Sequence, residues 1–211
     1  DGDVRPVRGI IGKLLNKQCR AATAVFIPKD NVAQASLTGL ETIYPVSSLQ
    51  ELINHLAGSA LIQPIEPSAV QSANAASPLS IDMSEIHEQD AAKRALIIAA
   101  AGGHNVLMSG PPGTGKSMLA KAFVGILPPL TREQALESTQ LHSLVTRTYG
   151  AILQSPPLRT PHHTASDVAL IGGGHNLRPG EITLAHNGVL FLDEMPEFHR
   201  YAIESLRQPL E

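Results

Sequence analysis

The sequence contains very few aromatic residues and no tryptophan. Phenylalanine, tyrosine and tryptophan together make up 3% of its 211 residues. Proteins that bind single-stranded nucleic acid by stacking bases need several aromatic rings, so we do not expect this class. Cys19 is the only cysteine. It excludes an internal disulfide framework and is typical of a reducing compartment.

Long apolar runs and an excess of charge of one sign are also missing. No apolar stretch reaches the ~18 residues that a membrane-spanning helix needs, and no basic-then-apolar leader is present. The formal net charge of −3 excludes a uniformly basic nucleic-acid coat, although oligomerisation could still create a local basic surface. We therefore expect a cytoplasmic protein that does not contact a membrane.

One loop is rich in glycine and ends in a lysine and a serine. It matches the phosphate-binding pattern G-x-x-x-x-G-K-[ST] without a mismatch. Its residues are Gly110, Pro111, Pro112, Gly113, Thr114, Gly115, Lys116 and Ser117. Glycine permits the tight turns that point backbone N–H groups at a phosphate, Lys116 adds positive charge, and the Ser117 hydroxyl is suited to Mg²⁺. The loop predicts a nucleotide site.

The segments around this loop predict the order strand, loop, helix. The apolar run 104–109 is typical of a buried parallel strand, and 118–127 of a helix whose N-terminus faces the phosphates. Residues 189–192 form a second apolar run that ends in Asp193 and Glu194. We expect Asp193 to hold Mg²⁺ and Glu194 to polarise the attacking water. Lys116, Asp193 and Glu194 are thus the candidate catalytic residues.

A long irregular region, 155–180, separates the two halves of the site. A loop of this length inside a domain is typically functional or contains small elements of its own. We predict that 168–171 and 181–185 pair as a hairpin that forms a projecting insert. The insert and its base carry four candidate contacts to DNA: Arg159, His162, His163 and Arg178.

Composition divides the chain into three parts. Residues 1–57 show an α/β pattern, with strands expected at 24–27 and 42–45 and a helix at 49–56 capped by Ser48. Residues 58–80 are rich in Ala, Ser, Pro, Gln and Asn, which is typical of a linker. Residues 81–211 contain both nucleotide motifs. Because the chain starts without methionine, we expect it to be a piece of a longer protein.

Several segments of the sequence resemble one protein family. Residues 103–117, 161–166 and 179–194 are similar to the YifB/ComM branch of magnesium-chelatase-like AAA+ ATPases, and 1–9, 20–28 and 44–52 resemble the end of the Lon-protease-like domain that precedes that motor. The fold implied is α/β: a P-loop NTPase core of the AAA+ type with a parallel sheet, preceded by part of a Lon-like domain. Ile86 and His87 then lie where AAA+ proteins contact adenine, with Glu88 in place of the usual glycine.

The resemblance also implies an activity. Members of this branch are ATPases that use ATP and Mg²⁺ to remodel or translocate on DNA, as helicase or branch-migration motors in competence and recombination, and act as hexameric homo-oligomers. In such motors the sensor residue, the arginine finger and the helical lid lie beyond the position of residue 211. We therefore expect weak or no hydrolysis by residues 1–211 alone, with turnover lower by roughly 10³-fold or more.

Two other functions stay open. The first is a magnesium chelatase motor subunit, which drives metal insertion into a porphyrin. Such subunits share the sequence segment that ends in Asp193 and Glu194. A non-hydrolysing assembly module would use the nucleotide only to fix an oligomerisation surface, and it would not need a water-polarising carboxylate.

Overall fold

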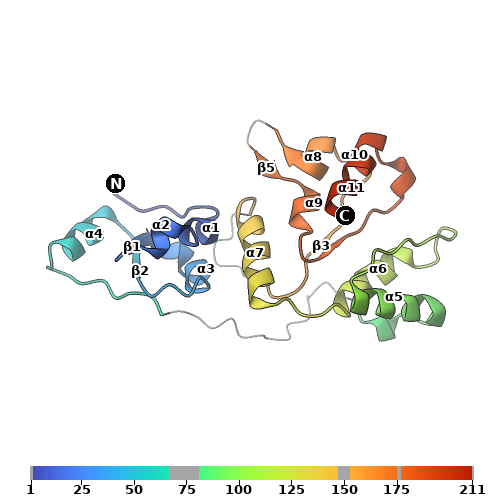
Figure 1. Ribbon diagram of the computed structural model, residues 1–211, viewed down its shortest axis with the longest axis horizontal. Coiled ribbons are helices and arrows are strands. Elements are labelled where there is room, and N and C mark those ends of the chain that lie inside the picture. Colours follow the sequence, from blue (N-terminus) through green and yellow to red (C-terminus); the bar gives the residue numbers. More distant parts are fainter. Residues whose placement is uncertain (1, 67–80, 147–152, 175–176, 211) are drawn as a thin grey trace. The chain divides into compact units, whose positions relative to one another are not determined.

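The computed structural model describes residues 2–66, 81–146, 153–174 and 177–210 (Figure 1). The chain is a mixed α/β protein with small parallel sheets, as predicted. It divides into two compact units, residues 1–71 with 132–153 and residues 72–131 with 154–211. The limits 1–57, 58–80 and 81–211 derived from composition stay a prediction. Within the described ranges, no helix has the length and apolar character needed to cross a membrane.

The first unit is built around a parallel pair of strands. Strand β1 pairs with β2 in the register Val25↔Ile43 to Pro28↔Val46. The predicted capping of the helix at 49–56 is confirmed, since Ser48 accepts a hydrogen bond from the Glu51 N–H at 3.2 Å. The elements are α1 (Ile10–Leu14), α2 (Lys17–Arg20), β1 (Val25–Pro28), η1 (Lys29–Asn31), α3 (Val32–Ser36), β2 (Ile43–Val46), α4 (Leu49–Leu56) and α7 (Arg132–Ser143).

A dense apolar core holds this unit together. Ile11 and Ile43 are completely buried, and Leu14 and Leu37 are 1% exposed. Helix α7, shown in yellow in Figure 1, packs against α1, and its Leu136 joins the same core. Arg132 at the start of α7 also donates to the Leu37 carbonyl at 3.3 Å. Residues 132–143 therefore belong with the N-terminal part of the chain, although the nucleotide loop precedes them in sequence.

The second unit contains both nucleotide motifs and several short elements. Strand β3 pairs in parallel with β6 in the register Leu158↔Val189 and Arg159↔Leu190. A buried parallel strand was expected over 189–192; the parallel pairing is confirmed, but the strand ends at Leu190 and its residues are only half-buried. The elements are η2 (Met83–Glu85), α5 (Asp90–Gly102), α6 (Lys116–Gly125), β3 (Leu158–Arg159), α8 (Asp167–Ile171), β4 (Gly172–Gly173), β5 (Arg178–Pro179), α9 (Glu181–Leu184), β6 (Val189–Leu190), η3 (Met195–Glu197), α10 (Arg200–Ser205) and α11 (Arg207–Leu210).

Two elements differ from the predictions. Residues 104–109 form no strand, and Leu107 is 85% exposed. A short apolar run stays extended and open when no neighbouring backbone pairs with it. Residues 168–171 and 181–185 lie in the helices α8 and α9 rather than in a hairpin. The hairpin of this region is smaller and antiparallel, and it joins β4 to β5.

Candidate nucleotide site

The glycine loop ends at the first turn of α6. Gly113 and Gly115 have φ values of 81° and 80°, a left-handed backbone that only glycine adopts without strain. A Cβ added at either position would meet no atom within 4 Å. The backbone conformation, and not lack of space, therefore requires glycine here. Gly115 is also the N-cap of α6, so the free N–H groups at the start of this helix border the loop.

The lysine of the motif lies against its own loop. Lys116 Nζ donates to the carbonyl oxygens of Gly110 at 3.0 Å and Pro111 at 2.9 Å. The hydroxyl of Thr114 also donates to the Pro111 carbonyl, at 2.9 Å. The positive charge is therefore held where the loop curves, which is the place where a phosphate would need it.

The two halves of the site meet at a serine and an aspartate. Ser117 Oγ donates to Asp193 Oδ2 at 2.9 Å, across 76 positions of sequence. Asp193 lies three residues after the last residue of β6, and the pairing of β6 with β3 fixes the position of the strand that leads to it. A hydroxyl and a carboxylate oxygen at this distance are a donor set that suits Mg²⁺. The residues present fit the metal that the motif predicts.

Glu194 points to a different neighbour. Its backbone is left-handed, with φ 53°, and its N–H donates to Asp193 Oδ1 at 3.1 Å. Its Oε2 lies 3.4 Å from His163 Nδ1. Both side chains border a hollow of about 480 Å³ that Pro196 and Glu197 also line. The hollow offers room for a small polar group beside the carboxylate.

The segment before α5 contributes a contact that the sequence prediction did not include. Gln89 Nε2 donates to the Thr114 carbonyl at 2.9 Å and so ties this segment to the glycine loop. Gln89 follows Glu88, in the segment that the family resemblance places near the adenine, and this was the available signal. Ile86 is 7% exposed and packs with Leu96 and Leu119, whereas His87 is exposed. Of the two predicted adenine contacts, only His87 presents an accessible side chain.

Comparison with known proteins assigns the sequence around this site to a family. Residues 82–211 match the family model for magnesium chelatase, subunit ChlI. The chain belongs to this magnesium chelatase family. The matched range contains the glycine loop, Ser117, Asp193 and Glu194 together, so the family assignment and the geometry concern the same residues.

Members of the YifB/ComM branch are similar along the whole chain. The chain is 44% identical to the uncharacterized protein YifB of Salmonella typhimurium and 43% identical to the competence protein ComM of Haemophilus influenzae and to YifB of Escherichia coli. Each alignment covers 100% of this chain and 41 to 42% of the relative. The resemblance to this branch is confirmed. The chain spans less than half the length of the curated relatives it matches.

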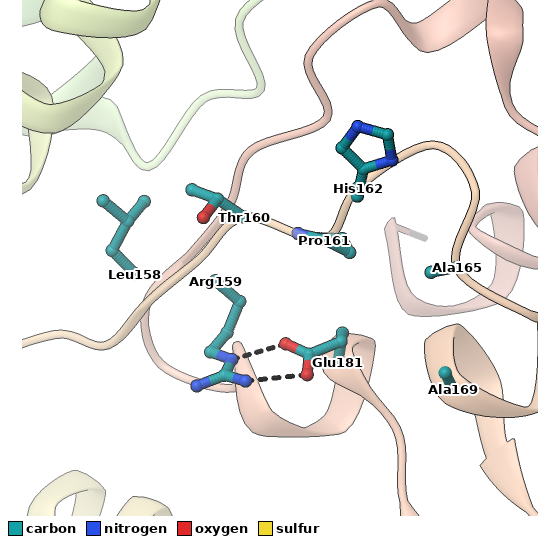
Figure 2. A pocket seen from close by; sticks show the side chains of 8 residues that line it. All are labelled: Leu158, Arg159, Thr160, Pro161, His162, Ala165, Ala169 and Glu181. Carbon is teal, nitrogen blue, oxygen red and sulfur yellow. Dashed lines mark hydrogen bonds and ion pairs between the residues drawn. The ribbon is translucent and has the colours of Figure 1, made fainter.

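Within this magnesium chelatase family member, the four candidate DNA contacts differ in their surroundings. Arg159 forms a bidentate ion pair with Glu181, at 2.5 Å from Nε and 2.7 Å from Nη2 (Figure 2). His163 faces Glu194, and His162 Nδ1 lies 2.8 Å from the Thr164 hydroxyl. Arg178 is exposed on β5. Two of the four side chains thus already face a carboxylate.

Asp82 marks the start of the matched range. The Ser84 hydroxyl and N–H both donate to Asp82 Oδ1, at 2.7 and 2.8 Å. These hydrogen bonds favour the ionised form, and they lower the pKa of Asp82 below its ordinary value. The Asp82 carboxylate caps η2 and so orders the turn before Ile86.

Proposed function

We propose that this chain is the ATP-binding part of an AAA+ motor that hydrolyses ATP to remodel or translocate on DNA. The observation that carries the proposal is the hydrogen bond between Ser117 and Asp193, which joins the phosphate-binding loop to an acidic pair. An Asp-Glu pair after a parallel strand, beside such a loop, is the arrangement that nucleotide hydrolysis requires.

Each residue of the site has a chemical role in this proposal. Lys116 neutralises charge on the terminal phosphates, and Ser117 with Asp193 would hold Mg²⁺. Bound Mg²⁺ would supply further positive charge to the same phosphates. Glu194 accepts a proton from the attacking water as general base. The hydroxyl–carboxylate pair and the strained backbone at Glu194 support these roles.

DNA is the proposed partner of the motor. One relative carries the printed name competence protein, which is consistent with a process that handles DNA. Arg178 supports a contact, because it is exposed and lies on the β4–β5 hairpin, and among the described residues no carboxylate forms an ion pair with it. His162 is exposed on the segment after β3. Arg159 and His163 are weaker candidates because carboxylates already face them.

The assembly and the domain order are part of the same proposal. We propose that residues 1–57 end a Lon-protease-like domain, that 58–80 are a linker, and that 81–211 begin the AAA+ motor. A hexameric ring in the full-length protein would add positive charge at the γ-phosphate from neighbouring subunits. The position of Arg178 on a hairpin would suit a contact inside such a ring.

A second function is favoured by the family itself. The matching model describes a magnesium chelatase subunit, so the motor could drive metal insertion into a porphyrin. The residues of the nucleotide site would be the same in both cases. What differs is the partner that stimulates hydrolysis.

ATP hydrolysis by the full-length protein separates these functions. It should be measured with single-stranded, duplex and branched DNA and with porphyrin-binding partners, with Glu194→Gln as the control. The proposal predicts stimulation by DNA that is lost in the Glu194→Gln variant. Stimulation only by the porphyrin-binding partners would support the chelatase function. Nucleotide-dependent assembly without any turnover would indicate an assembly module.

A further inference from the structure

The two carboxylates that follow β6 point to different partners. Asp193 Oδ2 accepts a hydrogen bond from Ser117 in the nucleotide loop. Glu194 Oε2 lies 3.4 Å from His163 Nδ1, and the Glu194 side chain is 67% exposed. An exposed glutamate has many rotamers of similar energy, and a partner that selects one of them keeps the carboxylate in place. Among the described residues, His163 is the one whose ring nitrogen lies beside this carboxylate.

The ring of His163 is itself held by aromatic neighbours. The rings of His162 and His163 lie 4.1 Å apart between centroids. Phe198 meets the His163 ring edge to face at 6.5 Å, with 82° between the planes. Phe198 is 5% exposed and packs in the buried cluster with Leu170 and Ala202. His163 therefore connects Glu194 to a packed part of the second unit.

The segment that carries His163 is anchored at its other end. Arg159 lies in β3 and accepts a backbone hydrogen bond from the Phe191 N–H at 2.9 Å. Its guanidinium donates two hydrogen bonds to the Glu181 carboxylate, as Figure 2 shows. Bidentate pairs of this kind fix geometry as well as charge. Pro161, between Arg159 and His163, restricts the backbone further.

From these contacts we propose that His163 is a positioning residue for Glu194. It holds the carboxylate of the general base in one rotamer, and the Arg159–Glu181 pair fixes the segment from which His163 acts. The inference rests on the proposed function, because it assigns the reaction step to Glu194. It gives His163 a role in turnover and not in DNA contact.

Kinetics of ATP hydrolysis by the full-length protein test this role. His163→Ala should lower kcat about tenfold, as loss of an orienting residue typically does, with KM for ATP unchanged. His163→Asn keeps a side-chain N–H near the position of Nδ1 and should restore most of kcat. His199→Ala is the matched control, because that imidazole is 82% exposed and lies 3.9 Å from a different carboxylate, Asp167. It should leave kcat unchanged.

A second readout needs neither nucleotide nor turnover. In the nucleotide-free chain, the ring ¹⁵N chemical shifts of His163 should change when Glu194 is replaced by glutamine, while those of His199 should not. Unchanged His163 shifts, together with a wild-type or raised kcat in a folded His163→Ala variant, would overturn the positioning role. Full activity of Glu194→Gln would instead overturn the role of Glu194 on which the proposed function depends.

Discussion

The first unit places glycine at each described position with a left-handed backbone, whereas the second unit places both glycine and other residues at such positions. Gly2, Gly9, Gly39 and Gly58 are the positive-φ residues of the first unit. The second unit has five positive-φ residues that are not glycine, namely Glu88, Gln89, Leu177, Asn187 and Glu194. A left-handed conformation costs such a residue roughly 1–2 kcal/mol. Three of the five lie at the candidate nucleotide site.

Over the ranges that the structure describes, the first unit has more completely buried large apolar side chains than the second. Ile11, Leu14, Leu37 and Ile43 in the first unit are at most 1% exposed, and Leu170 is the comparable large apolar side chain among the described residues of the second. Large apolar side chains of the first unit thus form a tightly packed core. The second unit instead has residues with a strained backbone at the candidate nucleotide site. Backbone strain of this kind typically collects at functional sites. The difference supports the proposal that the functional site lies in the second unit, and it does so independently of the motif.

The largest effect should come from replacing the carboxylate of Glu194, the residue whose backbone is strained. Glu194→Gln in the full-length protein should lower the rate of ATP hydrolysis by about 10²–10⁴-fold, because the general base is lost, while nucleotide affinity stays within a factor of a few. Single-turnover kinetics measure this. Glu204→Gln, at an exposed carboxylate that pairs with Arg200, is the control and should be close to wild type. Equal losses in both variants would show that the strain at Glu194 does not mark the base.

A change in the core of the first unit should separate stability from function. Ile43→Ala removes a completely buried side chain and should lower the free energy of unfolding by about 2–5 kcal/mol. The affinity of the folded protein for nucleotide should not change. Urea unfolding and nucleotide titration measure the two quantities. Ile53→Ala, at a side chain that is 49% exposed, should cost far less, and a similar cost at both sites would contradict the account of the core.

The smallest effects should come from replacing a glycine with a left-handed backbone by alanine, and a glutamate with a left-handed backbone by glycine. Gly58→Ala, at φ 75° with no atom within 4 Å of the added Cβ, should destabilise the protein by about 1 kcal/mol. Glu88→Gly, at φ 56°, should stabilise it by up to about 1 kcal/mol, since the strain is relieved but the unfolded chain gains entropy. Urea unfolding of both variants measures the change. Two changes of the same sign would contradict the comparison.

The sequence predicted the parts of the site that short patterns determine. The glycine loop with α6 is one such part, and the meeting of Ser117 with Asp193 follows from two motifs that act on one ligand. The helix α8 also had a local signal, because Ser166 caps it by accepting from the Ala169 N–H at 3.2 Å. The apolar residues at 168–171 alone are also compatible with a strand, and the cap at Ser166 is the signal that favours the helix.

Other features depend on distant parts of the chain. Whether residues 104–109 form a strand depends on a neighbour with which to pair, which the run itself does not specify. The pairs Arg159–Glu181 and His163–Glu194 depend on the register between β3 and β6. The packing of α7 on α1 likewise joins residues far apart in sequence. A single sequence carries no direct signal for these contacts.

We propose above all that Lys116, Ser117 and Asp193 form one Mg²⁺-dependent nucleotide site. The most direct test is the titration of this chain with a fluorescent ATP analogue, with and without Mg²⁺, alongside the Lys116→Ala and Asp193→Asn variants. The account predicts saturable binding that is lost in Lys116→Ala and that no longer responds to Mg²⁺ in Asp193→Asn. Binding of equal strength and equal Mg²⁺ dependence in all three proteins would contradict it.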